Sequence, residues 1–196
     1  MKVLNLRSVF WFFGLTLVLF SGSACKRKYT PKPSGYFRID FPKKEYRAFA
    51  GNFPYSFEYP VYGKIEKYKG EIAEPYWMNI DFPEYKGKIY ISYFRLNHDL
   101  SKYFEESRNL AYKHTIKADA INEELVQDKK RKIYGIIYHI KGNTASSINF
   151  VLTDSMHNFL RGALYFDTHP NKDSLAPVID FFQKDIDHLI ATIKWK

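Results

Sequence analysis

Residues 132–166, KIYGIIYHIKGNTASSINFVLTDSMHNFLRGALYF, contain three candidate strands separated by short polar connections. We expect the strands at 132–140, 147–153 and 159–166, because each is rich in β-branched and aromatic residues and is bounded by turn-forming residues. In the first, Ile133 and Ile137 lie on one face, and the opposite face is also apolar. A strand with two apolar faces is typically covered on both sides. This stretch therefore predicts an antiparallel meander that includes a central strand of a sheet.

Further strands are predicted on the N-terminal side of this stretch, at residues 36–41, 53–68, 77–82, 88–96 and 121–126. The segment 53–68 is expected to break near Pro60 and Gly63. Apolar and polar residues alternate in 36–41 and in 77–82, as in half-buried strands. In 77–82, Met78, Ile80 and Phe82 face one way and Asn79 and Asp81 the other. Both segments run into the same tetrapeptide, Ile-Asp-Phe-Pro, at 39–42 and 80–83, but two short copies do not establish an internal repeat.

Two amphipathic helices complete the expected fold. The first follows Asn97 or Asp99 as the N-cap and ends near Ile116, with one stripe formed by Leu100, Tyr103, Phe104, Ser107, Ala111 and His114. The second is expected to begin at Ser174 as the N-cap, to place Pro177 in its first turn, and to keep an apolar face as far as Ile193. The fold class is therefore α+β: a mainly antiparallel sheet with helices packed on it, one layer on each face.

The N-terminus has the three parts of a secretory signal. Lys2 and Arg7 precede an apolar run at 9–20, and small residues at 21–24 precede Cys25, the sole cysteine. The apolar run is shorter than the ~20 residues that span a bilayer as a helix. We therefore predict a signal peptide at 1–24 and lipid modification of Cys25, although Gly22 stands where a lipobox usually has an aliphatic residue. The alternative is ordinary cleavage nearby, which would leave an unmodified thiol.

The rest of the chain is organised simply. We expect a lipidated N-terminus and linker at 25–34, which contains two prolines, and a single globular domain at 35–196. Without residues 1–24 the chain keeps 28 Lys and Arg against 21 Asp and Glu. The basic run at 129–132 is most simply a charged turn, and no nucleic-acid partner is predicted. The abundant aromatic residues are strand residues or, alternatively, part of a binding face for glycan or protein.

Sharper chemical sites are not predicted. The six histidines, at 98, 114, 139, 157, 169 and 188, lack the spacing of metal ligands, and His114 and His139 are expected to be hydrogen-bonded core residues. Residues of hydrolase type occur at Ser146, Ser147, Asp154 and His157, without a nucleophile-elbow sequence around them.

Residues 141–144 form a hairpin turn or, less simply, an anion site. The adjacent acidic pairs Glu105–Glu106 and Glu123–Glu124 should point apart. We expect no catalytic, cofactor-binding or metal-binding residues.

Six phrases, read together, resemble a known family: GYFRIDFP (35–42), SFEYP (56–60), LAYKHTIKADAI (110–121), KGNTASS (141–147), FLRGALYF (159–166) and NKDSLAPVI (171–179). In this order, behind a lipoprotein signal, they are similar to the gliding motility lipoprotein GldD family of Bacteroidota, from about residue 30 to the end. The element order also resembles the Mog1/PsbP-like α/β/α sandwich.

This resemblance implies a non-enzymatic accessory component of the gliding motility machinery, linked to type IX secretion and acting through protein–protein contacts. It carries over one functional residue, the acylated Cys25, and no cofactor. The expected partners are the membrane, through the N-terminal lipid, and other proteins of the machinery. The expected location is the periplasmic side of a membrane, the outer rather than the inner one because no Asp follows Cys25. The alternative function is a lipoprotein that binds cell-wall glycan or a small ligand in an aromatic groove.

Overall fold

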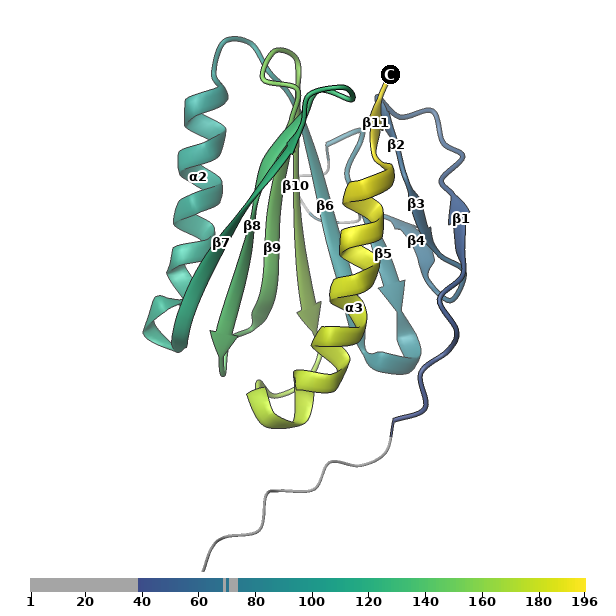
Figure 1. Ribbon diagram of the computed structural model, residues 1–196, viewed down its shortest axis with the longest axis vertical. Helices are drawn as coiled ribbons and strands as arrows, with labels where there is room; N and C mark the ends of the chain where they lie inside the picture. Colours follow the sequence, from purple (N-terminus) through teal and green to yellow (C-terminus); the bar gives the residue numbers. More distant parts are fainter. Residues whose placement is uncertain (1–38, 69, 71–73) are drawn as a thin grey trace, which may run out of the picture. The chain divides into compact units, whose positions relative to one another are not determined.

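Residues 39–68, 70 and 74–196, which the computed structural model describes, are built around an antiparallel sheet of seven strands (Figure 1). The strands follow the order β4 (Lys64–Lys67), β5 (Met78–Phe82), β6 (Gly87–Arg95), β10 (Asn158–Phe166), β9 (Ser146–Thr153), β8 (Ile133–Gly142) and β7 (Ala118–Asp128). The predicted meander is confirmed, because β7, β8, β9 and β10 are successive neighbours.

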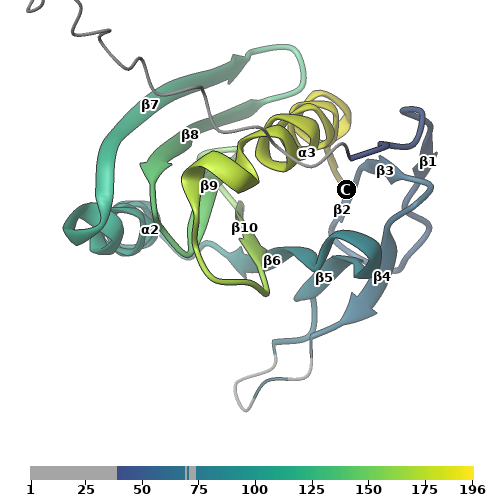
Figure 2. The same cartoon turned by 90° about the horizontal axis from the view of Figure 1, so that it is seen from below.

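Helices cover both faces of this sheet (Figure 2). Helix α3 (Lys172–Thr192) lies against one face and helix α2 (Leu100–Tyr112) against the other. Strand β8 serves both layers: Ile133 and Ile137 belong to the core cluster that includes α3, whereas Tyr138 and Ile140 belong to the cluster that includes α2. The predicted α/β/α arrangement is therefore confirmed. Strand β8 is not at the centre of the sheet, however, but one strand in from the edge strand β7.

Helix α3 begins earlier than the sequence predicts. Its N-cap is Asn171, whose side-chain oxygen accepts hydrogen bonds from the N–H groups of Asp173 and Ser174, both at 3.1 Å. Ser174 is therefore inside the helix, and Pro177 lies in its second turn and not in the first. The prediction failed because two residues able to cap stand three positions apart, and asparagine and serine cap helices about equally well.

Of the two predicted N-caps of helix α2, Asp99 and not Asn97 is the one found. Two residues of the predicted stripe, Ser107 and Ala111, are buried. The carboxylate of Asp99 accepts a hydrogen bond from the N–H of Asn97 at 2.8 Å and makes none within the helix. The α-helix ends at Tyr112, and the predicted last turn is a 3₁₀-helix, Lys113–Ile116.

The predicted first strand is wrong where it can be compared, because residues 39–45 belong to no strand; residues 36–38 lie outside the described part. The apolar residues of this segment pack on the core instead, with the ring of Phe41 stacked on that of Phe181 at 4.3 Å between centroids. Pairing starts later, with β1 (Tyr46–Ala48) against β3 (Glu58–Pro60) and β2 (Tyr55–Ser56) against β11 (Lys194–Trp195). The predicted break near Pro60 and Gly63 separates β3 from β4.

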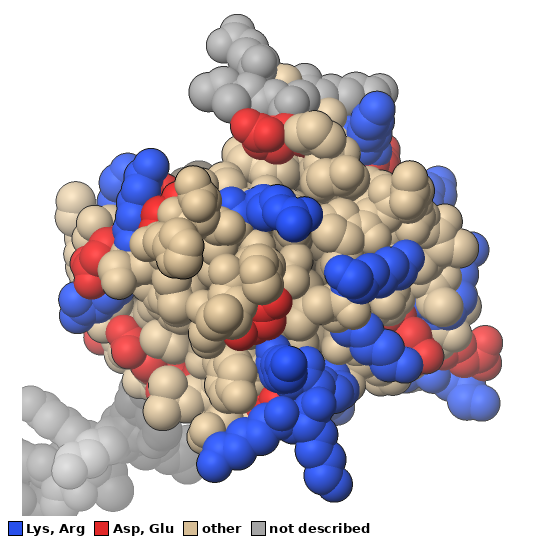
Figure 3. All heavy atoms as spheres, turned by 90° about the horizontal axis from the view of Figure 1, so that it is seen from above, with Lys and Arg blue, Asp and Glu red and all other residues tan. Residues whose placement is uncertain are grey.

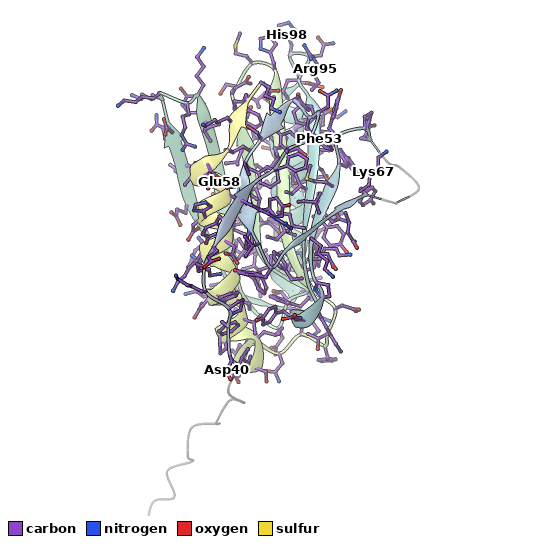
Figure 4. All side chains as sticks on the ribbon, turned by 90° about the vertical axis from the view of Figure 1, so that its right-hand side faces the viewer. Asp40, Phe53, Glu58, Lys67, Arg95 and His98 are labelled. Carbon is purple, nitrogen blue, oxygen red and sulfur yellow. The ribbon has the colours of Figure 1, made fainter. Side chains whose placement is uncertain are left out.

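The two ends of the described unit differ. Asp40 lies at the end where the described chain begins, and Arg95 and His98 lie at the opposite end (Figure 4). Seen from above, basic and acidic side chains are interspersed with uncharged ones (Figure 3).

The predicted signal peptide, Cys25 and the linker lie outside the described residues. Within the described part, we find no helix that is long and apolar enough to cross a membrane.

Candidate functional site

One face of the sheet is only partly covered by helix α2. The helix packs at the β8–β10 side, over residues such as Tyr138, Val151 and Phe159. Beyond it, the strand register places Arg161 of β10 opposite Ser92 of β6. Because side chains alternate between the faces of a strand, these residues share the face of α2, and so do the residues two positions along each strand.

A cleft of about 540 Å3 lies on this open part of the face, a volume within the range of small-molecule sites. Its lining is rich in aromatic residues and in uncharged polar groups. The lining residues are Tyr68, Trp77, Asn79, Tyr90, Ile91, Ser92, Ser107, Leu110, Lys113, His114, Tyr138, Asn149, Phe150, Val151, Arg161, Gly162, Ala163 and Tyr165. The cleft has the aromatic lining that the alternative function of glycan or ligand binding would require.

Arg161 is the charged group at the centre of this surface. It is half-buried, and its guanidinium carbon lies 5.3 Å from the centre of the Phe94 ring. Burial lowers the pKa of Arg161, and the charge of Glu106 only partly opposes this effect. No residue of the described part makes a hydrogen bond or a salt bridge to the guanidinium. The cleft therefore contains a partly desolvated cation without a carboxylate of the described residues in contact.

Asn79 adds an unsatisfied acceptor to the same cleft. The residue is only 7% exposed, and its side-chain oxygen has no hydrogen-bond partner in the described part. It stands opposite Tyr90 on the neighbouring strand, and the Tyr90 ring meets that of Tyr165 edge-on at 5.5 Å. Buried polar groups are nearly always paired, so an exception invites a functional explanation.

The rim of the cleft next to α2 carries Lys113 and His114. Burial lowers the pKa of His114, which therefore favours the neutral ring near pH 7. The described residues offer no hydrogen bond to that ring, contrary to the prediction of a hydrogen-bonded core histidine. The ring of His139 does have a partner, Glu124, at 3.0 Å.

A second cavity, of about 580 Å3, lies between α3 and the strands β7 and β8. Two of its charged groups pair with each other, Lys172 with Asp119 at 2.6 Å. Its His139 is held by Glu124. Because these groups already have partners, this cavity is a weaker candidate than the cleft beside α2.

The residues of hydrolase type are not brought together. Ser146 begins β9, and its hydroxyl donates to the side-chain oxygen of Asn149 at 2.6 Å, inside the protein. Asp154 and His157 lie in the turn beyond the other end of β9, roughly 25 Å away at the rise of an extended strand. The Asp154 carboxylate is occupied there by backbone N–H groups, including that of His157 at 2.8 Å. These four residues form no catalytic triad.

The remaining polar candidates have structural roles. The 141–144 segment spans the end of β8 and the start of the β8–β9 hairpin connection, where the Asn143 side chain accepts the N–H of Lys172 at 2.8 Å. Glu123 and Glu124 point to different partners, the hydroxyl of Tyr112 and the ring of His139. Within the described residues, no group of three or more His, Cys, Asp or Glu is arranged to hold a metal ion.

Sequence reasoning missed Arg161 and Asn79. Arg161 was visible as a single charge inside the apolar strand 159–166, which is an unusual place for an unpaired cation. Asn79 was placed correctly on the face opposite Met78, but the alternation of polar and apolar residues suggested solvent on that side. The burial of Asn79 depends on the neighbouring strands and aromatic side chains, which are distant in sequence.

Comparison with known families decides the wider assignment. A family model described as gliding motility lipoprotein GldD matches residues 26–195. The chain belongs to the GldD family. The resemblance seen in six sequence phrases is thereby confirmed over nearly the whole predicted mature chain. This chain is therefore a gliding motility lipoprotein of the GldD family. The family match gives no role to the cleft beside α2. A search of curated proteins gave no match.

Among solved structures, the chain is similar to cyanobacterial PsbP (CyanoP) from Synechocystis. The TM-score is 0.51 at 13% sequence identity, and the match covers 84% of this chain and 100% of the cyanobacterial one. At this identity the likeness shows the fold alone. It confirms the predicted PsbP-like arrangement of the GldD-family domain.

Proposed function

We propose that this protein is a membrane-anchored periplasmic lipoprotein that acts as a non-enzymatic accessory component of the gliding motility machinery. In this proposal it is linked to type IX secretion and works through contacts with other proteins of the machinery. The observation that carries the proposal is the GldD family match over residues 26–195. The separation of Ser146 from Asp154 and His157 across β9 supports a non-enzymatic role.

The anchor in this proposal is a lipid on Cys25. The thiol follows the small residues of the predicted cleavage site directly. Two or more acyl chains hold a protein stably on a membrane, and basic residues such as those at 26–28 add attraction to anionic lipid. The proposed site is the periplasmic side of the outer membrane.

The test is single-cell movement on a surface after deletion of the gene. We expect the deletion to stop movement, the wild-type gene to restore it, and Cys25→Ala to fail although the protein is made. Thr30→Ala is the matched control and should restore movement, because it keeps the cysteine and the basic residues at 26–28. Normal movement of the deletion strain would contradict the motility role. Full rescue by Cys25→Ala would contradict the lipid anchor alone.

A second candidate function is favoured by one observation, the aromatic cleft beside α2. A lipoprotein with such a cleft is suited to bind cell-wall glycan or another small ligand. Sedimentation of the purified protein with peptidoglycan tests this function. We expect co-sedimentation that soluble peptidoglycan fragments compete away, and a protein that stays in the supernatant would contradict cell-wall binding.

A further inference from the structure

We propose that the cleft beside α2 binds a sugar that carries a carboxylate, and that Arg161 pairs with this carboxylate while Asn79 accepts a hydrogen bond from a neighbouring hydroxyl or amide of the sugar. The proposal rests on the second candidate function above and specifies the chemistry of its ligand.

The first step is that the guanidinium of Arg161 is partly buried without an anionic partner. A cation removed from water is costly unless an anion pairs with it. The described residues supply no such anion in contact, and the aromatic ring beside the guanidinium, that of Phe94, contributes only its face. A planar guanidinium binds a carboxylate through two parallel hydrogen bonds. A ligand carboxylate in the cleft would therefore provide the missing partner.

The second step is the position of Asn79 relative to Arg161. Strand β6 lies between their strands, and their partners on it, Tyr90 and Ser92, are two residues apart. The side chains of Asn79 and Arg161 both point to the α2 face, and their backbones stand about 12 Å apart across the sheet. The free side-chain oxygen of Asn79 needs a donor. The ligand should therefore present a carboxylate at one end and a hydroxyl or amide donor at the other, a separation that one or two sugar units can span.

The third step separates a sugar from a peptide. Trp77 and Tyr90 line the cleft, and aromatic side chains suit an amphipathic ring with one apolar side. Strands β5, β6 and β10 each have neighbours on both sides in the sheet. The floor of the cleft therefore has no free strand edge on which an extended peptide could add a strand. These features favour a sugar.

The experiment uses the mature lipoprotein purified in detergent and titrated by calorimetry. Two acidic probes represent the two sources of such a ligand: N-acetylmuramic acid for cell wall and glucuronic acid for acidic polysaccharide. N-acetylglucosamine is the matched neutral probe, and a short acetylated peptide with a free C-terminal carboxylate is the competitor class. We expect at least one acidic sugar to bind about tenfold or more tightly than the neutral one, as a charged hydrogen-bonded pair requires.

Variants assign the effect to the cleft. Arg161→Met should reduce the affinity for the acidic sugar to that for the neutral one, and Asn79→Leu should weaken the binding of both. Arg95→Met, an exposed arginine outside the cleft lining, is the control and should change nothing. Because Arg161 has no carboxylate in contact, Arg161→Met should also keep the thermal midpoint of the wild type, which a structural arginine would not do. If Arg161→Met does not fold, Arg161→Lys is the variant to measure. It keeps the positive charge but lacks the two parallel donors of the guanidinium, so it should bind the acidic sugar with intermediate affinity.

The outcomes are distinct. Equal affinity for acidic and neutral sugars, or acidic-sugar binding that survives both Arg161 variants, would overturn the proposal. Binding of the peptide without either sugar would overturn the choice of ligand class. If no probe binds but the protein still sediments with peptidoglycan, the cleft proposal fails and the second candidate function stands. If sedimentation also fails, both fail.

Discussion

At the residue scale, Asp185 in helix α3 is a buried carboxylate that binds three side-chain donors. Its side chain is fully buried and accepts hydrogen bonds from Lys44 at 2.7 Å, Tyr62 at 2.6 Å and Tyr46 at 3.1 Å. Burial lowers the pKa of Lys44, although the pairing with Asp185 opposes this. Burial, reinforced by the carboxylate, raises the pKa of Tyr46 and Tyr62. Because the three donors come from the first part of the described chain, Asp185 holds that segment on α3.

We expect Asp185→Ala to lower the free energy of unfolding by about 3 kcal/mol, because it leaves the Lys44 ammonium partly buried without its anion. Urea denaturation measures this loss. The control is Glu45→Ala, which removes an exposed carboxylate 3.9 Å from Lys43 and should cost less than about 0.5 kcal/mol. Similar losses for the two variants would contradict the structural role of Asp185.

Asp154 links stability to acid. Burial opposes the charge of its carboxylate, but the N–H groups of Asn158, His157 and Met156 outweigh burial and lower its pKa below the ordinary value. The unfolded chain therefore takes up a proton at this site more readily than the folded one. The stabilisation by Asp154 is complete above the unfolded pKa of about 4 and is lost as the pH falls through the folded pKa.

We expect the unfolding free energy of Asp154→Asn to depend less steeply on pH than that of the wild type as the pH falls below about 4. Urea midpoints across this range measure the difference. Parallel pH curves for the two proteins would show that the carboxylate contributes nothing to acid sensitivity.

At the element scale, helix α3 is tied at both ends by polar side chains. Asn171 caps its first turn. At the other end, the guanidinium of Arg131 donates to the carbonyl oxygens of Ala191 at 2.6 Å and Ile193 at 3.2 Å, while Asp128 holds Arg131 in place at 2.8 Å. Cations near the C-terminus of a helix stabilise its free carbonyl groups. The basic run at 129–132 is thus a charged turn, as predicted, in which one residue has a specific partner.

The N-cap provides a direct test of the start of α3. We expect Asn171→Ala to cost about 1 kcal/mol of unfolding free energy, because two N–H groups lose their acceptor. Ser174→Ala, at the N-cap that the sequence suggested, should change the stability by less than about 0.5 kcal/mol. Urea denaturation of the pair decides between the two positions, and the reverse order of effects would move the helix start back to Ser174.

At the scale of the whole molecule, the sheet joins two core clusters into one folding unit. The cluster that includes α3 and the cluster that includes α2 share strands β8, β9 and β10, so neither layer can separate without exposing apolar residues of the other. The end of the chain is bound to the early part of the domain, since β11 pairs with β2. A domain of this size with a continuous core is expected to unfold in a single transition.

Two tryptophans outside the predicted signal peptide report on this cooperativity. The indole N–H of Trp77, in the cleft lining, donates to the carbonyl of Tyr93 at 2.9 Å, and that of Trp195, in β11, donates to the carbonyl of Lys132 at 3.2 Å. The variant Trp77→Phe leaves the fluorescence of Trp195, and the variant Trp195→Phe leaves that of Trp77. We expect each variant's fluorescence and circular-dichroism midpoints in urea to coincide. An earlier fluorescence transition of Trp195 would indicate that the C-terminal pairing opens independently.

By itself, the sequence determined the layered α+β fold and the meander of β7 to β10, because the period of apolar residues along a segment is a local property. The family was identified by the resemblance of six sequence phrases and not by this period. Only the tertiary structure decided which segments find a partner. Ile-Asp-Phe at 80–82 lies in strand β5, between β4 and β6, whereas the same three residues at 39–41 form no strand. There, Ile39 and Phe41 pack on the core instead. The cleft depended on the tertiary structure for the same reason: the burial of Arg161 and Asn79 is produced by strands and aromatic side chains far away in the sequence.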